Sequence, residues 1–170
     1  MPGWYDILNF DTLNRSDDEP GVLRSRGYLH SLINQQVADG IPPSRIILGG
    51  FSQGGAMAIF SGPTFREKLA GVFGLSCYQL LPEKFDSLIA ETGTEGKIRS
   101  RPNIFMGHGD ADPLVKPEWG RMTADGLRKK GFEVEFHEYP DLQHGADPKE
   151  IDDLEVWVTK RLEDTKEEKL

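Results

Sequence analysis

Apolar residues recur at helical spacing between residues 17 and 39. They are Val22, Leu29, Leu32, Ile33 and Val37, with separations of three, four and seven. This spacing predicts an amphipathic helix with one face turned toward a core. Glu19 stands three positions after Ser16, Pro20 suits a first helical turn, and Gly40 suits the end of a helix. Both helix boundaries are therefore predicted from local residue types.

Short runs rich in apolar residues further along the chain predict strands. These runs span residues 45–50, 69–76, 103–107 and 134–139. Such runs are typical of parallel strands that are covered on both faces. Helices are predicted for residues 53–60 and 117–130, although Gly120 and Gly126 weaken the second prediction. Alternating strands and helices favour an α/β fold with a mostly parallel sheet and flanking helices.

The C-terminal part of the chain contains a further helical pattern and two weaker segments. One helical face is expected to carry Ile151, Leu154, Val158 and Leu162. Residues 82–102 are expected to form a surface excursion, in which Phe85, Leu88 and Ile89 make at most one or two helical turns. Residues 163–170 are nearly all charged and are expected to fray into solvent. We expect residues 1–170 to form one domain.

Composition excludes several functional classes. The 170 residues are 37% hydrophobic, which suits one globular domain, and the net charge of −8 argues against nucleic acid as a partner. Cys77 is the single cysteine, which favours a reducing compartment and hence a cytoplasmic location. No run approaches the ~18 apolar residues of a membrane-spanning segment, so membrane contact would be peripheral. No histidine or cysteine pairs with acids at ligand spacing, so no metal or organic cofactor is expected.

A possible nucleophile lies in Gly50-Phe51-Ser52-Gln53-Gly54. This G-x-S-x-G sequence follows an apolar strand directly and precedes a short helical run directly. A sharp turn between strand and helix presents a serine hydroxyl above a sheet, and the helix N-terminus adds partial positive charge where an oxyanion develops. The context therefore predicts that Ser52 is a nucleophile.

A serine nucleophile needs a base and an acid that orients the base, and both follow later in the chain. His144 lies in the loop after the 134–139 strand, whereas the other histidines, His30, His108 and His137, occupy positions that suggest packing or solvated roles. Two acids, Asp110 and Asp112, follow the 103–107 strand. Pro113 favours Asp112 by fixing an extended turn, with Asp110 bracing the loop instead, but pattern alone leaves both acids possible.

At these residues the chain resembles the acyl-protein thioesterase family, within the phospholipase/carboxylesterase group of α/β-hydrolases. The similar segments are residues 1–7, 40–42, 45–55, 69–72, 75–77 and 108–115. The resemblance implies a triad of Ser52, Asp112 and His144, with the backbone amide of Gln53 as an oxyanion donor. It implies that palmitoylated cysteines on proteins are the substrates, with lysophospholipids and small esters as side substrates, and that no cofactor is needed.

Two departures from the family pattern affect these expectations. Tyr78 stands where the family usually has tryptophan, on a proposed acyl-binding surface with Leu80 and Leu81; Trp4 is a further candidate contact, although packing suits it better. An apolar strand, a His-Gly-Leu-Gly-Asp oxyanion loop and another strand normally precede residues 4–6 in the family. Without them, we expect an exposed apolar edge at residues 46–48, self-association through that edge, and poor activity. The alternatives are an esterase or lysophospholipase acting on small substrates, and a non-catalytic remnant.

Overall fold

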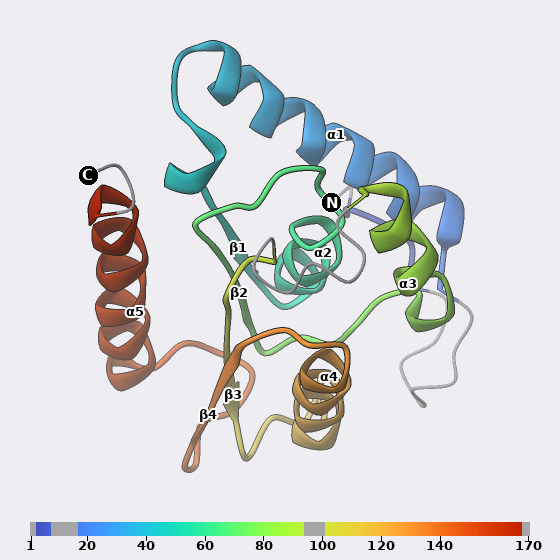
Figure 1. Cartoon of the computed structure of the whole chain (residues 1–170). Coiled ribbons are helices and arrows are strands. Elements are labelled where there is room, and N and C mark those ends of the chain that lie inside the picture. The colour runs from blue at the N-terminus through green and yellow to red at the C-terminus, as the bar shows by residue number, and fades with distance from the viewer. Residues whose placement is uncertain (1–2, 8–16, 94–100, 168–170) are drawn as a thin grey trace.

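Four parallel strands form one sheet in the computed structural model, which describes residues 3–7, 17–93 and 101–167 (Figure 1). The strands, in spatial order, are β1 (Ile47–Phe51), β2 (Gly71–Leu75), β3 (Ile104–Gly109) and β4 (Val134–Tyr139). The helices are α1 (Glu19–Ala38), the 3-10 turn η1 (Pro43–Arg45), α2 (Gln53–Ser61), α3 (Pro82–Glu91), α4 (Pro117–Lys129) and α5 (Pro148–Glu167). A helix connects each strand to the next, as parallel pairing requires. The predicted α/β class with a mostly parallel sheet is confirmed.

Helices cover the two faces of the sheet unequally. Figure 1 shows α5 on one side and α1, α2, α3 and α4 on the other. The larger core lies on the side of the four helices, and Cys77 is fully buried within it. A smaller cluster lies under α5 and is built on Leu75, Phe105 and Trp157. Most of the buried apolar area is therefore on one face.

Strand β1 forms an open edge of the sheet. Within the described ranges it pairs with β2 alone. The carbonyl of Ile46 accepts from the amide of Ala70 and the amide of Ser52 donates to Leu75, so even-numbered residues bond toward β2. Because alternate residues of a strand point their backbone groups in opposite directions, the N–H and C=O groups of Ile47 and Gly49 face outward. The predicted exposed edge is present in this part of the chain.

Helix α1 agrees with its predicted boundaries. Its N-cap is Asp18, whose carboxylate accepts from the amide of Gly21 at 3.1 Å. Ser16, the expected first residue of a capping box, lies outside the described residues. At the other end Gly40 has φ +97°, a conformation that favours glycine and ends the helix. The predicted apolar face is correct except at Leu32, which is 39% exposed.

The expected surface excursion is wrong for residues 82–91. They form α3, and its Phe85 and Ile89 are buried in the main core. The ring of Phe85 lies 6.1 Å from that of Phe60 and 6.3 Å from that of Phe132. Spacing of four places both buried residues on one helical face, but a pattern of only two anchors was too short to reveal a core element. Residues 94–100 of this segment lie outside the described residues.

The predicted face of α5 is correct at Leu154 and Val158, which pack on the smaller cluster, but wrong at Ile151. Trp157 is buried while Ile151 is 45% exposed, and Glu150 is completely buried in the first turn. The buried face of α5 therefore includes an acid and a tryptophan, which an assignment based on aliphatic residues alone does not identify. The helix continues to Glu167, and residues 168–170 of the expected frayed end lie outside the described residues.

Helix α4 tolerates its glycines, and one of them is needed. A Cβ atom added to Gly120 would lie 2.4 Å from Nδ1 of His108, so glycine allows α4 to pack directly on that ring. Among the helices of residues 17–93 and 101–167, none is long and apolar enough to cross a membrane.

Candidate active site

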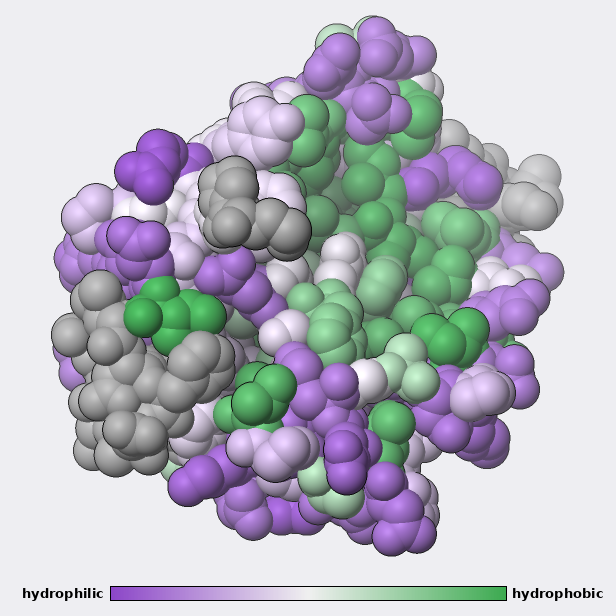
Figure 2. All heavy atoms as spheres, turned by 180° about the vertical axis from the view of Figure 1, so that it is seen from behind, coloured by the Kyte–Doolittle hydropathy of each residue, from purple (hydrophilic) through white to green (hydrophobic). Residues whose placement is uncertain are grey.

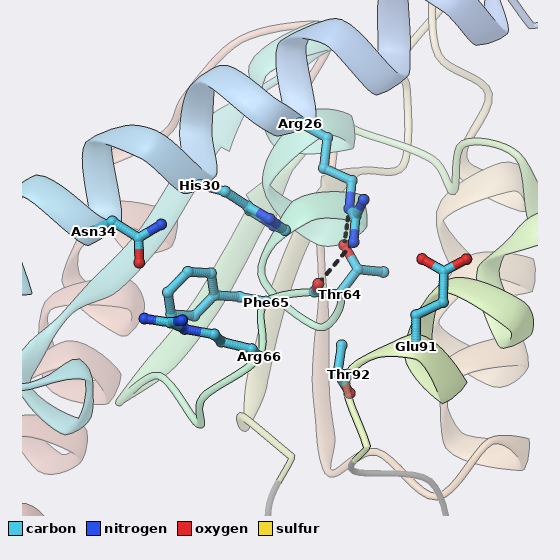
Figure 3. Close-up of a pocket in the computed structure, with 8 residues that line it drawn as sticks. All are labelled: Arg26, His30, Asn34, Thr64, Phe65, Arg66, Glu91 and Thr92. Atoms are coloured by element: carbon cyan, nitrogen blue, oxygen red, sulfur yellow. Dashed lines mark hydrogen bonds between the residues drawn. The ribbon is translucent and has the colours of Figure 1, made fainter.

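A polar pocket lies beside α1 (Figure 3). It is lined by Arg26, His30, Asn34, Thr64, Phe65, Arg66, Glu91 and Thr92. Arg26 donates from Nε to the hydroxyl of Thr64 at 2.8 Å, and Nε2 of His30 donates to the carbonyl of Ser61 at 2.8 Å. These bonds hold the α1 side chains to the turn after α2, which is the packing role expected for His30. The pocket therefore contains no member of the predicted triad.

Ser52 occupies the sharp turn between β1 and α2. Its φ of +54° lies in the region that favours glycine, which costs of order 1 to 3 kcal/mol for another residue. Its amide donates to the carbonyl of Leu75 on β2 at 2.8 Å, which fixes the turn to the sheet. Strand, strained turn and helix follow one another as the G-x-S-x-G sequence predicts.

The turn needs two glycines, but they are not both the glycines of the motif. A Cβ atom on Gly50 would lie 2.5 Å from the carbonyl carbon of Gly54. On Gly54 it would meet only Nε1 of Trp4 at 3.8 Å, an ordinary contact. On Gly55 it would lie 2.8 Å from the carbonyl oxygen of Gly50 and 3.0 Å from Cβ of Cys77. Gly50 and Gly55 are therefore the positions where the backbones meet too closely for a side chain.

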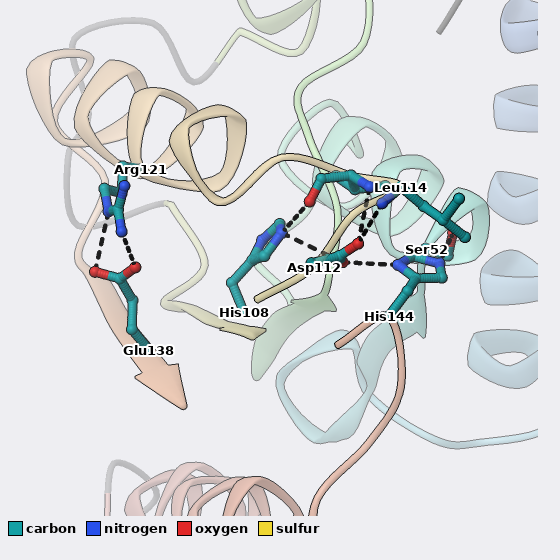
Figure 4. Close-up of polar contacts among 8 residues, drawn as sticks. Ser52, His108, Asp112, Leu114, Arg121, Glu138 and His144 are labelled. Atoms are coloured by element: carbon teal, nitrogen blue, oxygen red, sulfur yellow. Dashed lines mark hydrogen bonds and ion pairs between the residues drawn. The ribbon is translucent and has the colours of Figure 1, made fainter. Parts of the chain in front are cut away.

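The structure brings Ser52, His144 and Asp112 together in one hydrogen-bonded chain (Figure 4). Nε2 of His144 lies 2.9 Å from Oγ of Ser52, and Nδ1 lies 2.7 Å from Oδ2 of Asp112. An ionised carboxylate can only accept, so Nδ1 carries the ring proton and Nε2 is left to accept from the serine hydroxyl. This tautomer is the one that a general base requires.

Asp112 is held by backbone amides as well as by His144. It is 4% exposed, and its Oδ1 accepts from the amides of Leu114 and Val115, both at 2.9 Å. His108 lies behind it and donates from Nε2 to the carbonyl of Val115 at 2.8 Å. Burial lowers the pKa of His108 and favours a neutral ring. The loop after β3 therefore fixes the carboxylate of Asp112 from several directions.

Asp110 has a separate role in the same loop. Its Oδ1 accepts from the amide of Asp141 at 2.7 Å, and Asp141 has φ +59°. Asp110 thus braces the loop that carries His144, which is the bracing role considered for it from sequence. His137 stacks on Phe105 with ring centroids 5.2 Å apart, a packing role like that expected.

Gln53 begins α2, so its backbone N–H is among those that have no acceptor within the helix. Its side chain forms two hydrogen bonds with the N-terminal segment that were not predicted from the sequence. Oε1 accepts from the amide of Trp4 at 3.0 Å, and Nε2 donates to the carbonyl of Tyr5 at 2.8 Å. The side chain therefore ties residues 3–7 to the helix that follows the serine.

Three of the four expected substrate contacts lie in the core. Tyr78, Leu80 and Leu81 are 2%, 0% and 9% exposed, and the hydroxyl of Tyr78 lies 2.7 Å from that of Tyr5. The structure does not bring these side chains to the surface at Ser52. Trp4 is 37% exposed and lies 6.4 Å from the ring of Tyr28, in agreement with a packing aromatic.

Two exposed apolar residues beside the triad were missed by the sequence analysis. Phe51 is 39% exposed and its ring lies 4.8 Å from that of His144. Leu114 is 59% exposed, and its amide donates to Asp112 at 2.9 Å (Figure 4). The sequence contained one signal for them: Phe51 directly precedes Ser52, and Leu114 is two positions after Asp112. Residues so close in sequence to a site often lie on the same surface as the site.

Comparison with known proteins gives consistent results. A family profile described as Phospholipase/Carboxylesterase matches residues 1–162. The chain is 46% identical over 166 residues to acyl-protein thioesterase 1 of Neurospora crassa, covering 95% of this chain and 66% of that protein. It is 48% identical over 165 residues to acyl-protein thioesterase 1 of Emericella nidulans, covering 93% and 67%. The chain thus spans about two thirds of the length of these relatives.

Solved structures with the same fold include two plant proteins. The crystal structure of Arabidopsis thaliana SOBER1 matches with a TM-score of 0.79 and 27% identity, covering 94% of this chain and 74% of that one. The structure of Zea mays acyl-protein thioesterase 2 matches with a TM-score of 0.78 and 26% identity, covering 94% and 72%. The resemblance noted from the motifs is confirmed.

Proposed function

This chain belongs to the phospholipase/carboxylesterase family, and we propose that it hydrolyses acyl thioesters on proteins through an acyl-enzyme on Ser52. The observation that carries the proposal is the hydrogen-bonded chain from Asp112 through His144 to Ser52. We infer that the substrate is a thioester because the relatives from Neurospora crassa and Emericella nidulans are both named acyl-protein thioesterases.

The geometry supports a two-step reaction. Nε2 of His144 takes the proton of the Ser52 hydroxyl as Oγ attacks the acyl carbonyl carbon, and Asp112 stabilises the imidazolium while remaining ionised. We assign the amide of Gln53, at the N-terminal end of α2, as a donor to the oxyanion. His144 then protonates the leaving thiolate. Water attacks the acyl-enzyme with His144 again as base, which releases the carboxylic acid and restores Ser52.

The surface beside the triad supports an apolar acyl group. Phe51 and Leu114 expose apolar side chains next to His144 and Asp112. Burying such side chains against an alkyl chain gains about 0.8 kcal/mol for each methylene group removed from water. A long acyl chain would therefore be favoured over acetyl. Carboxylic esters of similar chain length are the second candidate, because the triad chemistry is shared and the family description names a carboxylesterase.

The open edge of β1 supports a second proposal about association. The outward backbone groups of Ile47 and Gly49 are unpaired by any described strand, and Phe51 is exposed on the same strand. Figure 2 shows a broad apolar area on the face seen from behind. Unpaired, apolar strand edges favour pairing with another chain, so we propose that two copies of the 170-residue chain associate there.

A fluorophosphonate probe tests the proposed function, because it reacts with serines that a neighbouring base activates. We expect labelling of the chain, and loss of labelling in Ser52→Ala and His144→Ala. Ser87→Ala and His137→Ala are the matched controls, since both residues lie outside the triad, and both variants should label normally. A labelled chain is then offered an S-palmitoyl peptide and the corresponding oxygen ester.

Three results are possible. Turnover of the thioester supports the proposal, and turnover of the oxygen ester alone supports the second candidate. No labelling of a cooperatively folded chain contradicts both and favours a non-catalytic role.

A further inference from the structure

Glu150 is a completely buried acid that the proposed reaction does not use. It is 0% exposed, and among the described residues neither carboxyl oxygen has a hydrogen bond of ordinary geometry, although the backbone of Asp147 favours the ionised form. Burying a polar group in this way costs free energy, so it needs an explanation. Its place in the chain offers one, because it lies in the first turn of α5, six residues after His144.

The carboxyl of Glu150 packs directly on the backbone of β3. A Cβ atom added to Gly107 would lie 2.4 Å from Oε1 of Glu150. The carbonyl of Gly107 accepts from the amide of Ser76 at 2.8 Å, so this residue joins β3 to the end of β2. Two residues later β3 ends and the loop with Asp112 begins. Glu150 therefore rests on the strand that leads to Asp112.

The loop that carries His144 is held against β3 at two points. At its start, a Cβ atom on Gly109 would lie 2.0 Å from the carbonyl oxygen of Leu142, which also accepts from the amide of Ala111 at 3.1 Å. At its end, Asp147 caps α5 by accepting from the amide of Lys149 at 2.7 Å, and Glu150 follows in the same turn. His144 lies between these two points.

We propose that Glu150 is a positioning residue for His144, which holds the first turn of α5 on Gly107 and so keeps the His144 ring within hydrogen-bond distance of both Ser52 and Asp112. The inference rests on the proposed function, since it assigns a purpose to that geometry. Glu150 itself touches neither the serine nor the acid.

The charge state of Glu150 gives the inference a distinctive readout. Burial raises the pKa of Glu150 to about 7. A hydrogen bond from the backbone of Asp147 lowers this pKa, whereas the negative charge of the Asp147 side chain raises it. The titratable groups that interact with Glu150 are Asp147, just before α5, and Tyr139 on β4. Lys149 pairs with Asp153, and the hydroxyl of Tyr139 donates to Asp153 at 3.2 Å, so neither group is directed at Glu150. A neutral carboxyl packs on Gly107 without a counterion, whereas an ionised one favours displacement of the turn.

Kinetics of four chains test the inference: wild type, Glu150→Gln, Glu150→Ala and the exposed control Glu155→Ala. We expect Glu150→Ala to lower kcat roughly ten- to a hundredfold with little change in KM, as for a misplaced catalytic base. Glu150→Gln should match wild type at pH 6, and its kcat relative to wild type should rise as the pH passes through about 7. Glu155→Ala should behave as wild type.

A spectroscopic measurement separates this inference from the proposed function. The Nδ1 proton of His144, bonded to Asp112, is expected to give a downfield NMR signal in wild type and Glu150→Gln that is lost in Glu150→Ala. This signal does not depend on turnover, so absence of fluorophosphonate labelling would count against the proposed function alone. An unchanged signal and unchanged kcat in Glu150→Ala would overturn the positioning role, as would a flat ratio of kcat for Glu150→Gln across the pH range.

If Glu150→Ala does not fold, Gly107→Ala serves in its place. The added methyl group would displace the carboxyl, so the same loss of the signal is expected, and a retained signal would overturn the inference.

Discussion

The two flanks of Ser52 are built differently. Toward β3 and β4 lie His144 and Asp112, with amides, a buried histidine and a bracing aspartate behind them. Toward the outside lies β1, which has no further strand among the described residues, and a short segment held by the side chain of Gln53. The first flank has what proton transfer requires, whereas the second has exposed apolar and unpaired backbone groups.

This difference indicates which properties each flank should control. Changes behind His144 should act on the chemical step, because they alter the base. Changes at β1 or Gln53 should act on stability and association and leave proton transfer largely intact. Four substitutions, described from the strongest predicted effect to the weakest, test this distinction.

Replacing Asp112 should have the largest effect. Asp112→Asn keeps the shape but favours the wrong tautomer of His144, and we expect kcat to fall by about 10⁴-fold. Asp110→Asn is the matched control in the same loop, where it braces the amide of Asp141. Steady-state hydrolysis of an ester by both variants measures the contrast. Similar losses in the two would show that the loop, rather than the orienting carboxylate, governs activity.

Glu150 should make stability depend on pH. Its pKa is raised from the ordinary 4.5 to about 7, so between these values the folded chain keeps a proton that the unfolded chain has lost. The free energy of unfolding should therefore fall as the pH rises from about 4.5 to about 7, by up to about 3 kcal/mol, with no further change from this group above that range. Urea unfolding of wild type and Glu150→Gln at pH 5 and pH 8 isolates the effect. If the free energy of unfolding changed equally between pH 5 and pH 8 in wild type and Glu150→Gln, Glu150 would not be the cause of the pH dependence.

On the open flank, Gln53→Ala should loosen residues 3–7, which are also held by hydrogen bonds to Asp18, Ser25 and Tyr78. Loss of the bonds to Trp4 and Tyr5 should lower the free energy of unfolding by about 1 to 2 kcal/mol. The backbone amide survives the substitution, so kcat should fall less than in Asp112→Asn. Gln36→Ala on the exposed side of α1 is the control for chemical denaturation. If the activation free energy calculated from kcat changed by more than the free energy of unfolding, Gln53 would act mainly on the reaction and not on the open flank.

The smallest effect is expected at the strand edge. Ile47→Lys places a charge on β1, which should weaken self-association by about tenfold, equivalent to about 1.4 kcal/mol. Because the Ile47 side chain also packs on the cluster under α5, urea unfolding first establishes that the variant is folded. Val156→Lys changes an exposed apolar residue on α5 instead and should leave association unchanged. Sedimentation equilibrium over a range of concentrations measures both. A wild-type chain that stays monomeric throughout would contradict association at this edge.

Local sequence rules predicted which side chains meet at Ser52, because the turn and loops that carry them are set by short-range constraints. A serine between an apolar strand and a helix must take a strained turn, and the structure has φ +54° at Ser52. The choice between Asp110 and Asp112 was harder, because both lie in one loop. The path of the loop that carries His144 decides between them: Asp112 contacts the His144 ring, whereas Asp110 accepts from the amide of Asp141.

Elements that depend on long-range packing were predicted less well. Phe85 and Ile89 form one buried stripe on a short helix, which sequence cannot distinguish from a surface turn. On α5, Glu150 is buried while Ile151 is exposed, the reverse of what hydropathy indicates. Tyr78 is polar enough to suggest a binding surface, yet its hydroxyl is satisfied inside the core by Tyr5. In each case a distant contact decided the environment.

Cys77 has a consequence for measuring motion at the nucleophile. It is the one cysteine of the sequence, it is fully buried, and it lies against Gly55, where α2 approaches the sheet. Burial raises its pKa to about 12, so a thiol reagent can react only after this contact has opened. The rate of thiol modification in native conditions thus measures how often the packing of Cys77 between Gly55 of α2 and Gly74 of β2 opens.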